Sequence, residues 1–141
     1  MYVYNGFLAH IARSFLRKET DINGYVPLYG EYEGGFEGEE TFTIDEEELW
    51  YLNRIVTLCK ENGSHLYFSQ APNFIPNNQY KEWLNDFCRS NNIVLLSHVD
   101  DVKYTQHPSL FVDNSHLNTK GADLYSEQLA TEIKQHETAN N

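Results

Sequence analysis

The sequence predicts an α/β fold in which amphipathic helices alternate with the short strands of a parallel sheet. Apolar residues recur at helical spacing over residues 44–62, 78–88 and 119–136. Between these helices lie two short apolar and aromatic runs, 65–69 and 93–96, which are typical of buried strands. The order helix, strand, helix, strand, loop, helix implies right-handed crossovers, with helices covering the sheet.

Length and composition are those of one folded domain. The chain has 141 residues, of which 40% are hydrophobic and 14% aromatic, and this composition argues against overall disorder. The net charge of −11 makes nucleic acid and anionic membranes unfavourable partners. Cys59 and Cys88 fall at apolar helical positions, so we expect two buried free thiols rather than a disulfide.

Residues 1–43 precede the alternating helices and strands and form a separate N-terminal part. Residues 1–18 predict a short helix; a membrane-surface helix is the weaker alternative, because only three cations are present. Residues 19–43 contain several glycines and no clear periodicity of apolar residues, which predicts a long loop. The acidic residues of this loop do not have the spacing of a calcium-binding EF-hand. Neither a signal peptide nor a membrane-length apolar stretch is visible, so we expect a soluble chain whose localisation stays open.

The first helix of the alternating part has recognisable ends. Thr43-Ile-Asp-Glu46 matches a capping box, with Thr43 as the N-cap and Glu46 at the third helical position. Gly63 suits the position just beyond the helix, which should end near Asn62. We expect burial of the apolar stripe formed by Leu49, Leu52, Ile55, Val56 and Cys59.

The second helix follows a loop, residues 70–76, at the C-terminal end of the first strand, where ligands bind in open α/β sheets. Asn77 or Asn78 should cap this helix. Its core stripe comprises Tyr80, Trp83, Leu84, Phe87 and Cys88. After the second strand, residues 97–110 are polar and irregular. Two strands cannot bury their own faces, so we expect a third strand from residues 26–28 or 41–44, or a partner chain.

The candidate site is the loop Asp113-Asn-Ser-His116, directly before the last helix, for which Asn118 is the N-cap candidate. A carboxylate three residues before an imidazole can turn back and accept its Nδ1–H. This contact fixes the tautomer, leaves Nε2 free as a base and stabilises the imidazolium. Asp113 and His116 are therefore candidates for the carboxylate and base of a hydrolytic triad. The alternative is a turn capped by Asp113 beside an ordinary surface histidine.

The run from Asp113 through His116-Leu-Asn-x-x-Gly-Ala122 to Tyr125-Ser126 resembles the last sequence block of the SGNH/GDSL hydrolase superfamily. It is similar in particular to bacterial SGNH-like proteins linked to envelope polysaccharide acylation. The resemblance implies that residues 44–137 are the C-terminal part of a three-layer α/β/α, flavodoxin-like domain. It also implies a serine esterase or O-acyltransferase for acyl (acetyl) esters or an acylated polysaccharide, facing the bacterial envelope, with no cofactor and no metal.

The chain departs from that family at the nucleophile. It contains no Gly-Asp-Ser block and no Gly-x-Asn-Asp block, so the serine and the oxyanion-hole residues are missing. Because losing the nucleophile of a triad costs several orders of magnitude in rate, we expect the chain alone to be inactive. A homo-oligomer and a missing N-terminal half both stay open. The alternative function is a non-catalytic remnant of the fold that binds a carbohydrate or a protein.

Two other chemistries have weaker sequence support. Ser69 and Ser115 could replace the nucleophile, but Ser69 lacks the glycines of a nucleophile elbow, and Ser115 is expected to stabilise the turn. A zinc site is the other alternative, although its loop spacing matches no recognised pattern. Its candidate ligands are His98, Asp100, Asp101, His107, Asp113 and His116.

Overall fold

A computed structural model describes residues 25–35, 41–74 and 77–139. The helix predicted for residues 1–18 lies outside the described residues. The elements, in chain order, are α2 (Glu46–Glu61), β1 (Tyr67–Gln70), α3 (Asn78–Asn91), β2 (Val94–Ser97), α4 (Val102–Thr105), the 3-10 turn η1 (Pro108–Leu110) and α5 (Thr119–Ala139).

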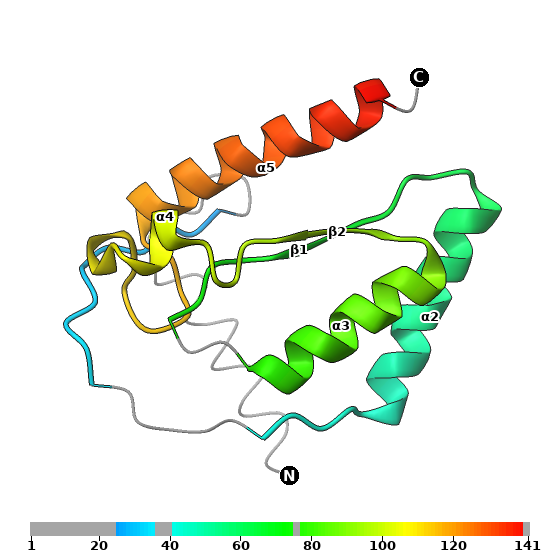
Figure 1. The fold of residues 1–141 in the computed structure, drawn as a ribbon, viewed down its shortest axis with the longest axis horizontal. Coiled ribbons are helices and arrows are strands. Elements are labelled where there is room, and N and C mark those ends of the chain that lie inside the picture. Colours follow the sequence, from blue (N-terminus) through cyan, green and yellow to red (C-terminus); the bar gives the residue numbers. More distant parts are fainter. Residues whose placement is uncertain (1–24, 36–40, 75–76, 140–141) are drawn as a thin grey trace, which may run out of the picture.

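The two strands form a parallel sheet, paired from Tyr67 with Val94 to Gln70 with Ser97. Figure 1 shows α5 along one face of the sheet and α3, with α2 beside it, on the other. The chain is therefore a mixed α/β fold with a short parallel sheet, as predicted. Residues 26–28 and 41–44 are not strands, so the expected third strand does not come from either segment.

Helix α2 begins two residues later than the capping box predicts. Asp45 is the N-cap, and its Oδ1 accepts the backbone N–H groups of Glu47 at 2.8 Å and Glu48 at 3.0 Å. The assignment of Thr43 as N-cap is therefore wrong, because an aspartate closer to the first turn satisfies those donors. Gly63 follows the helix with a φ of 63°, a conformation that favours glycine, as expected.

The inner stripe of α2 is only partly buried. Val56 is 3% exposed, whereas Leu49, Leu52 and Cys59 are half-buried. Ile55 is 48% exposed, so its predicted burial is wrong. Helix α2 therefore packs on its neighbours along a narrow line and leaves further apolar side chains uncovered.

Helix α3 forms the better packed layer on the same side of the sheet. The Oδ1 of Asn77 accepts the N–H of Tyr80 at 3.0 Å, which confirms Asn77 as the cap. Leu84 and Cys88 are buried, and both cysteines are free thiols, as predicted. The predicted burial is wrong for Cys59, which is half-buried, and for Tyr80, which is 38% exposed at the start of the helix. The rings of Phe87 and Phe68 stack with centroids 6.0 Å apart, which joins α3 to β1.

Helix α5 covers the opposite face and runs three residues beyond its predicted end near His136. Asn118 caps it, since its Oδ1 accepts the N–H of Gly121 at 3.1 Å. Near the far end, Glu137 accepts a hydrogen bond from the hydroxyl of Tyr67 at 2.5 Å and pairs with Nδ1 of His65 at 2.8 Å.

None of the helices within the described ranges combines the length and apolar character needed to cross a membrane.

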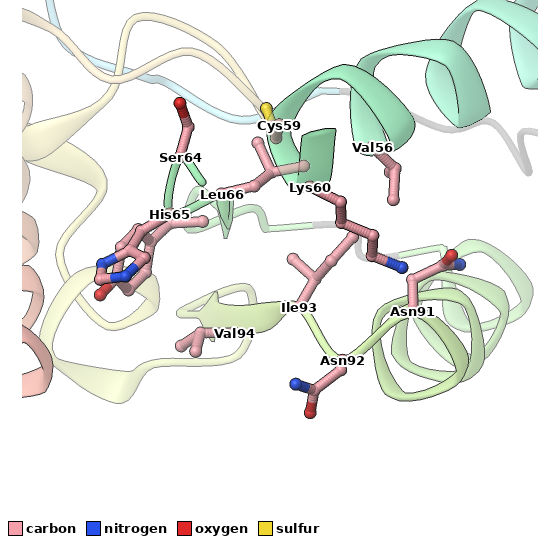
Figure 2. Close-up of a pocket in the computed structure, with 11 residues that line it drawn as sticks. Val56, Cys59, Lys60, Ser64, His65, Leu66, Asn91, Asn92, Ile93 and Val94 are labelled. Carbon is pink, nitrogen blue, oxygen red and sulfur yellow. The ribbon is translucent and has the colours of Figure 1, made fainter. Parts of the chain in front are cut away.

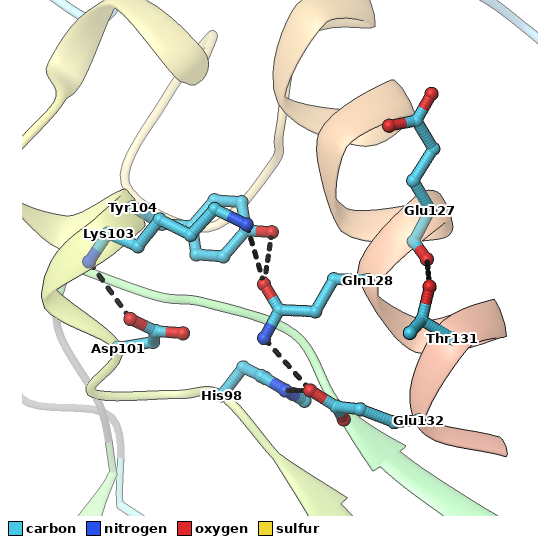
Figure 3. A network of polar contacts seen from close by, with 8 residues as sticks. All are labelled: His98, Asp101, Lys103, Tyr104, Glu127, Gln128, Thr131 and Glu132. Atoms are coloured by element: carbon cyan, nitrogen blue, oxygen red, sulfur yellow. Dashed lines mark hydrogen bonds and ion pairs between the residues drawn. The ribbon is translucent and has the colours of Figure 1, made fainter. Parts of the chain in front are cut away.

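The stretch 97–110, expected to be irregular, contains α4 and η1 and carries part of the core. Tyr104 is fully buried, and its hydroxyl donates to Oε1 of Gln128 at 2.9 Å. The amide of Gln128 donates to Glu132 at 3.0 Å, and Glu132 also pairs with Nε2 of the buried His98 at 2.9 Å. Figure 3 shows this network joining α5 to the segment that follows β2. These polar contacts fix α5 across the sheet.

Candidate catalytic loop

The candidate loop, residues 112–116, is closed at both ends by backbone contacts. Phe111 and Leu117 form an isolated antiparallel bridge, and the N–H of Val112 donates to the carbonyl of His116 at 2.9 Å. The side chain of Phe111 is fully buried and anchors the start of the loop. Because Asn118 caps α5 immediately afterwards, both ends of the loop are held by the core.

The structure brings the two predicted site residues together. Nδ1 of His116 lies 2.9 Å from Oδ2 and 3.0 Å from Oδ1 of Asp113. Oδ1 also accepts the backbone N–H groups of Ser115 at 2.9 Å and His116 at 2.7 Å. The carboxylate is thus held by the backbone and in turn holds the imidazole, which directs Nε2 away from it. The His116 side chain is 66% exposed, so most of the imidazole is open to solvent.

The carboxylate of Asp113 is held in its ionised form. Partial burial alone would raise its pKa, but the N–H groups of Ser115 and His116 and the imidazole outweigh burial and lower the pKa below 3.8. An ionised carboxylate at this place stabilises the imidazolium that forms when His116 takes up a proton.

A lowered pKa also makes Asp113 a source of stability above pH 4. The folded state favours the ionised group, so its contribution is complete above the unfolded pKa and is lost as pH falls through the folded pKa. Asp113→Asn should therefore lower the free energy of unfolding at pH 7, and the difference from wild type should shrink toward about pH 3. Urea unfolding at both pH values measures this.

The matched control for that measurement is Asp123→Asn, which changes an exposed carboxylate on α5. It should leave the difference between the two pH values unaltered. A loss of stability in Asp113→Asn that is equal at pH 7 and pH 3 would show that the contribution does not depend on ionisation.

The loop that leaves β1 packs against the candidate loop. The N–H of Phe74 donates to the carbonyl of Asn114 at 2.9 Å, and the N–H of Asn73 donates to the carbonyl of Val99 at 3.2 Å. The rings of Phe74 and Phe111 lie 4.5 Å apart. The edge expected to bind ligands and the imidazole–carboxylate pair are therefore neighbours.

A pocket of about 570 Å³ opens at this edge, between the C-terminal ends of the strands and the start of α3. Ser115 of the candidate loop and Ser69 of β1 both line it. The rings of Phe42 and Tyr80 lie 5.4 Å apart in its wall, and none of the described lining residues carries a charge. Neutral hydrogen-bonding groups next to aromatic rings suit an uncharged polar ligand.

Neither serine near the imidazole is placed as a nucleophile. The Oγ of Ser115 lies 3.2 Å from Nδ1 of His116 and 3.3 Å from Oδ1 of Asp113, so it contacts the ring on the carboxylate side rather than at Nε2. Ser69 lies within β1, not on a sharp turn after the strand, so its hydroxyl is not projected in the manner of a nucleophile elbow.

The histidines proposed as metal ligands diverge. His98 pairs with Glu132 of α5, while His116 pairs with Asp113. Across the described ranges, no three His, Cys, Asp or Glu side chains are grouped so that they could hold a metal ion.

Two other imidazole–carboxylate pairs were missed by sequence reasoning. His65 contacts Glu137, and His98 contacts Glu132, partners separated by 72 and 34 residues. No local motif links such distant positions, although both histidines flank strands.

His65 also lines a second pocket, of about 390 Å³, at the opposite end of the sheet, together with Cys59, Leu66 and Ile93. Figure 2 shows these side chains around that opening.

The chain was compared with protein-family models, curated proteins and solved structures, and no match was found in any of the three. The functional assignment therefore depends on the residues and geometry of this chain itself.

Proposed function

We propose that the chain is the base-and-carboxylate part of an SGNH/GDSL-type serine esterase or O-acyltransferase that acts on acyl esters such as acetyl esters. The observation that carries this proposal is the 2.9 Å contact between Asp113 and Nδ1 of His116, in a loop immediately before the final helix. The arrangement of the fold supports it, since helices lie on both faces of a parallel sheet, as in a partial three-layer α/β/α domain.

The chemistry divides between this chain and an external serine. Nε2 of His116 takes the serine proton as the hydroxyl oxygen bonds to the acyl carbon. Asp113 keeps the imidazole oriented and stabilises its positive charge. The imidazolium then returns the proton to the leaving alcohol as the ester bond breaks. The acyl group passes from the serine to water in hydrolysis or to a hydroxyl of an acceptor in acyl transfer.

The direct test compares the chain alone with the same chain joined to a preceding segment that contains a strand and a Gly-Asp-Ser block. The segment encoded immediately upstream of Met1 is the first choice. The chain alone should hydrolyse p-nitrophenyl acetate at the background rate, because it lacks that block. The joined protein should hydrolyse it well above background. A folded joined protein without activity would contradict the proposal.

A non-catalytic carbohydrate-binding role is the second candidate, and the neutral pocket beside the loop favours it. Its aromatic walls and uncharged polar groups match the apolar faces and hydroxyls of a sugar. Tyr80→Ala should weaken binding of an envelope-type polysaccharide fragment about tenfold in isothermal titration calorimetry. Tyr51→Ala, an exposed tyrosine on α2 outside this pocket, is the control. A wild-type titration without heat would count against this role.

A further inference from the structure

The side chain of Asn118 makes hydrogen bonds that a helix cap does not require. Its Oδ1 accepts the N–H of Gly121, which is the capping bond of α5. Its Nδ2 also donates to the carbonyl of Ser109 at 2.8 Å and to the carbonyl of Gly30 at 2.9 Å. The residue is 5% exposed, so these bonds are made inside the protein. Asn118 therefore joins the start of α5 to η1 and to the segment 25–35.

Among the side chains that cap helices well, only asparagine can supply this set of bonds. The two N–H groups of its amide serve two carbonyls, and the oxygen of the same amide accepts the capping N–H. Serine and aspartate cap helices about as well as asparagine. Serine, however, has one donor, and an ionised aspartate has none. Capping alone therefore does not account for an asparagine at this position.

Asn118 ends the short stretch of chain that carries His116. The carbonyl of His116 accepts the N–H of Val112 at 2.9 Å, and the N–H of Asn118 donates to the carbonyl of Leu110 at 2.9 Å. These two bonds hold the stretch against the other side of the loop. The imidazole itself is 66% exposed and is not enclosed by the core. Its place is therefore determined by this stretch of backbone and by Asp113.

The segment 25–35 also holds the loop at a second place. The rings of Tyr32 and Phe74 lie 5.2 Å apart. Phe74 in turn packs on Phe111, with ring centroids 4.5 Å apart, and donates its N–H to the carbonyl of Asn114 at 2.9 Å. The segment thus reaches the middle of the loop through aromatic rings and the end of the loop through the amide described above.

We propose that Asn118 is a positioning residue for His116. Because its amide is bonded to the carbonyls of Ser109 and Gly30, the stretch that carries the imidazole cannot slide along η1. The ring then stays where the carboxylate of Asp113 reaches Nδ1. The catalytic meaning of this role rests on the proposed function, since a fixed ring keeps Nε2 directed toward the serine. The positioning itself does not depend on a serine.

Nuclear magnetic resonance of the His116 imidazole in the full chain tests this role without catalysis. At about pH 8.5, where imidazole is neutral, the ¹⁵N shifts give the ratio of the Nδ1–H to the Nε2–H tautomer. The wild type should favour Nδ1–H, which donates to Asp113, and Asp113→Ala gives the ratio of the unpaired ring. Asn118→Ser keeps a good cap and removes both donors to the carbonyls. It should move the ratio at least about fivefold toward that of Asp113→Ala.

The matched control is Thr119→Val. This change removes the hydroxyl that donates to the carbonyl of Leu28 at 3.0 Å, while the backbone N–H of residue 119 still donates to the same carbonyl at 2.9 Å. The tautomer ratio should stay at the wild-type value. A purely structural role of Asn118 would lower stability but leave the ratio of the folded protein unchanged, and that result would overturn the proposal. Equal changes in Asn118→Ser and Thr119→Val would overturn it as well.

A second variant and a second measurement complete the test. If Asn118→Ser does not fold, Asn118→Asp decides by the same ratio, because it keeps the size and the cap and lacks both donors. In the joined, serine-containing protein, Asn118→Ser should lower kcat about tenfold and leave KM near the wild-type value. A joined protein without activity would contradict the proposed function, whereas the tautomer ratio alone decides the role of Asn118.

Discussion

His116→Ala is expected to lower ester hydrolysis by the serine-containing, joined protein by about 10²- to 10⁴-fold. The reason is local, because the 2.9 Å contact from Asp113 occupies Nδ1 and leaves Nε2 as the nitrogen that takes the serine proton. Without the imidazole of residue 116, the serine hydroxyl keeps its proton and attacks the ester slowly. Steady-state rates with p-nitrophenyl acetate measure the loss.

The control for this experiment is His107→Ala, since His107 is an exposed histidine outside the candidate loop. It should leave the rate near that of wild type. Asp113→Asn should also lower the rate, because it removes the acceptor that fixes the imidazole tautomer. A His116→Ala protein that is folded and retains wild-type activity would remove His116 from the mechanism and leave the carbohydrate-binding role as the stronger candidate.

The features that could be predicted from the sequence are those determined by short stretches of chain. Asp113 and His116 are three residues apart, so one turn brings them together, and the pairing was visible in the motif. Asn77 and Asn118 cap their helices through donors within three residues. The parallel pairing of the strands followed from the helix that separates them.

The features that could not be predicted depend on contacts between residues far apart in the sequence, or on which of two neighbouring residues takes the same structural role. His98 and Glu132 meet only because α5 crosses the sheet, and nothing in either segment specifies the other. At the start of α2, Thr43 and Asp45 both suit an N-cap, and the structure selects the residue nearer the first turn. Ile55 fits the helical period but is 48% exposed, because α2 packs only along a narrow line around Val56.

Gly121→Ala is expected to destabilise the fold by about 1–3 kcal/mol, opposite in sign to the usual effect of this change in a helix. The carbonyl of Leu110 accepts the N–H of Asn118 at 2.9 Å, and Gly121 lies directly against that carbonyl. A Cβ at position 121 would overlap the carbonyl oxygen and lie 2.9 Å from Cδ2 of Leu117. Backbone cannot move aside as a flexible side chain does, so the start of α5 must shift.

Such a shift would reach the candidate loop, which is closed by the bridge between Phe111 and Leu117. Leu110 directly precedes the buried Phe111, and Asn118 directly follows Leu117. Thermal and urea unfolding of Gly121→Ala should therefore show a lower midpoint than wild type. Ser126→Ala, at an exposed position of α5, is the matched control and should be neutral or slightly stabilising through helix propensity alone. If Gly121→Ala were as stable as wild type, the glycine would not be required by the close approach of α5 to Leu110, and its place in the motif would need another cause.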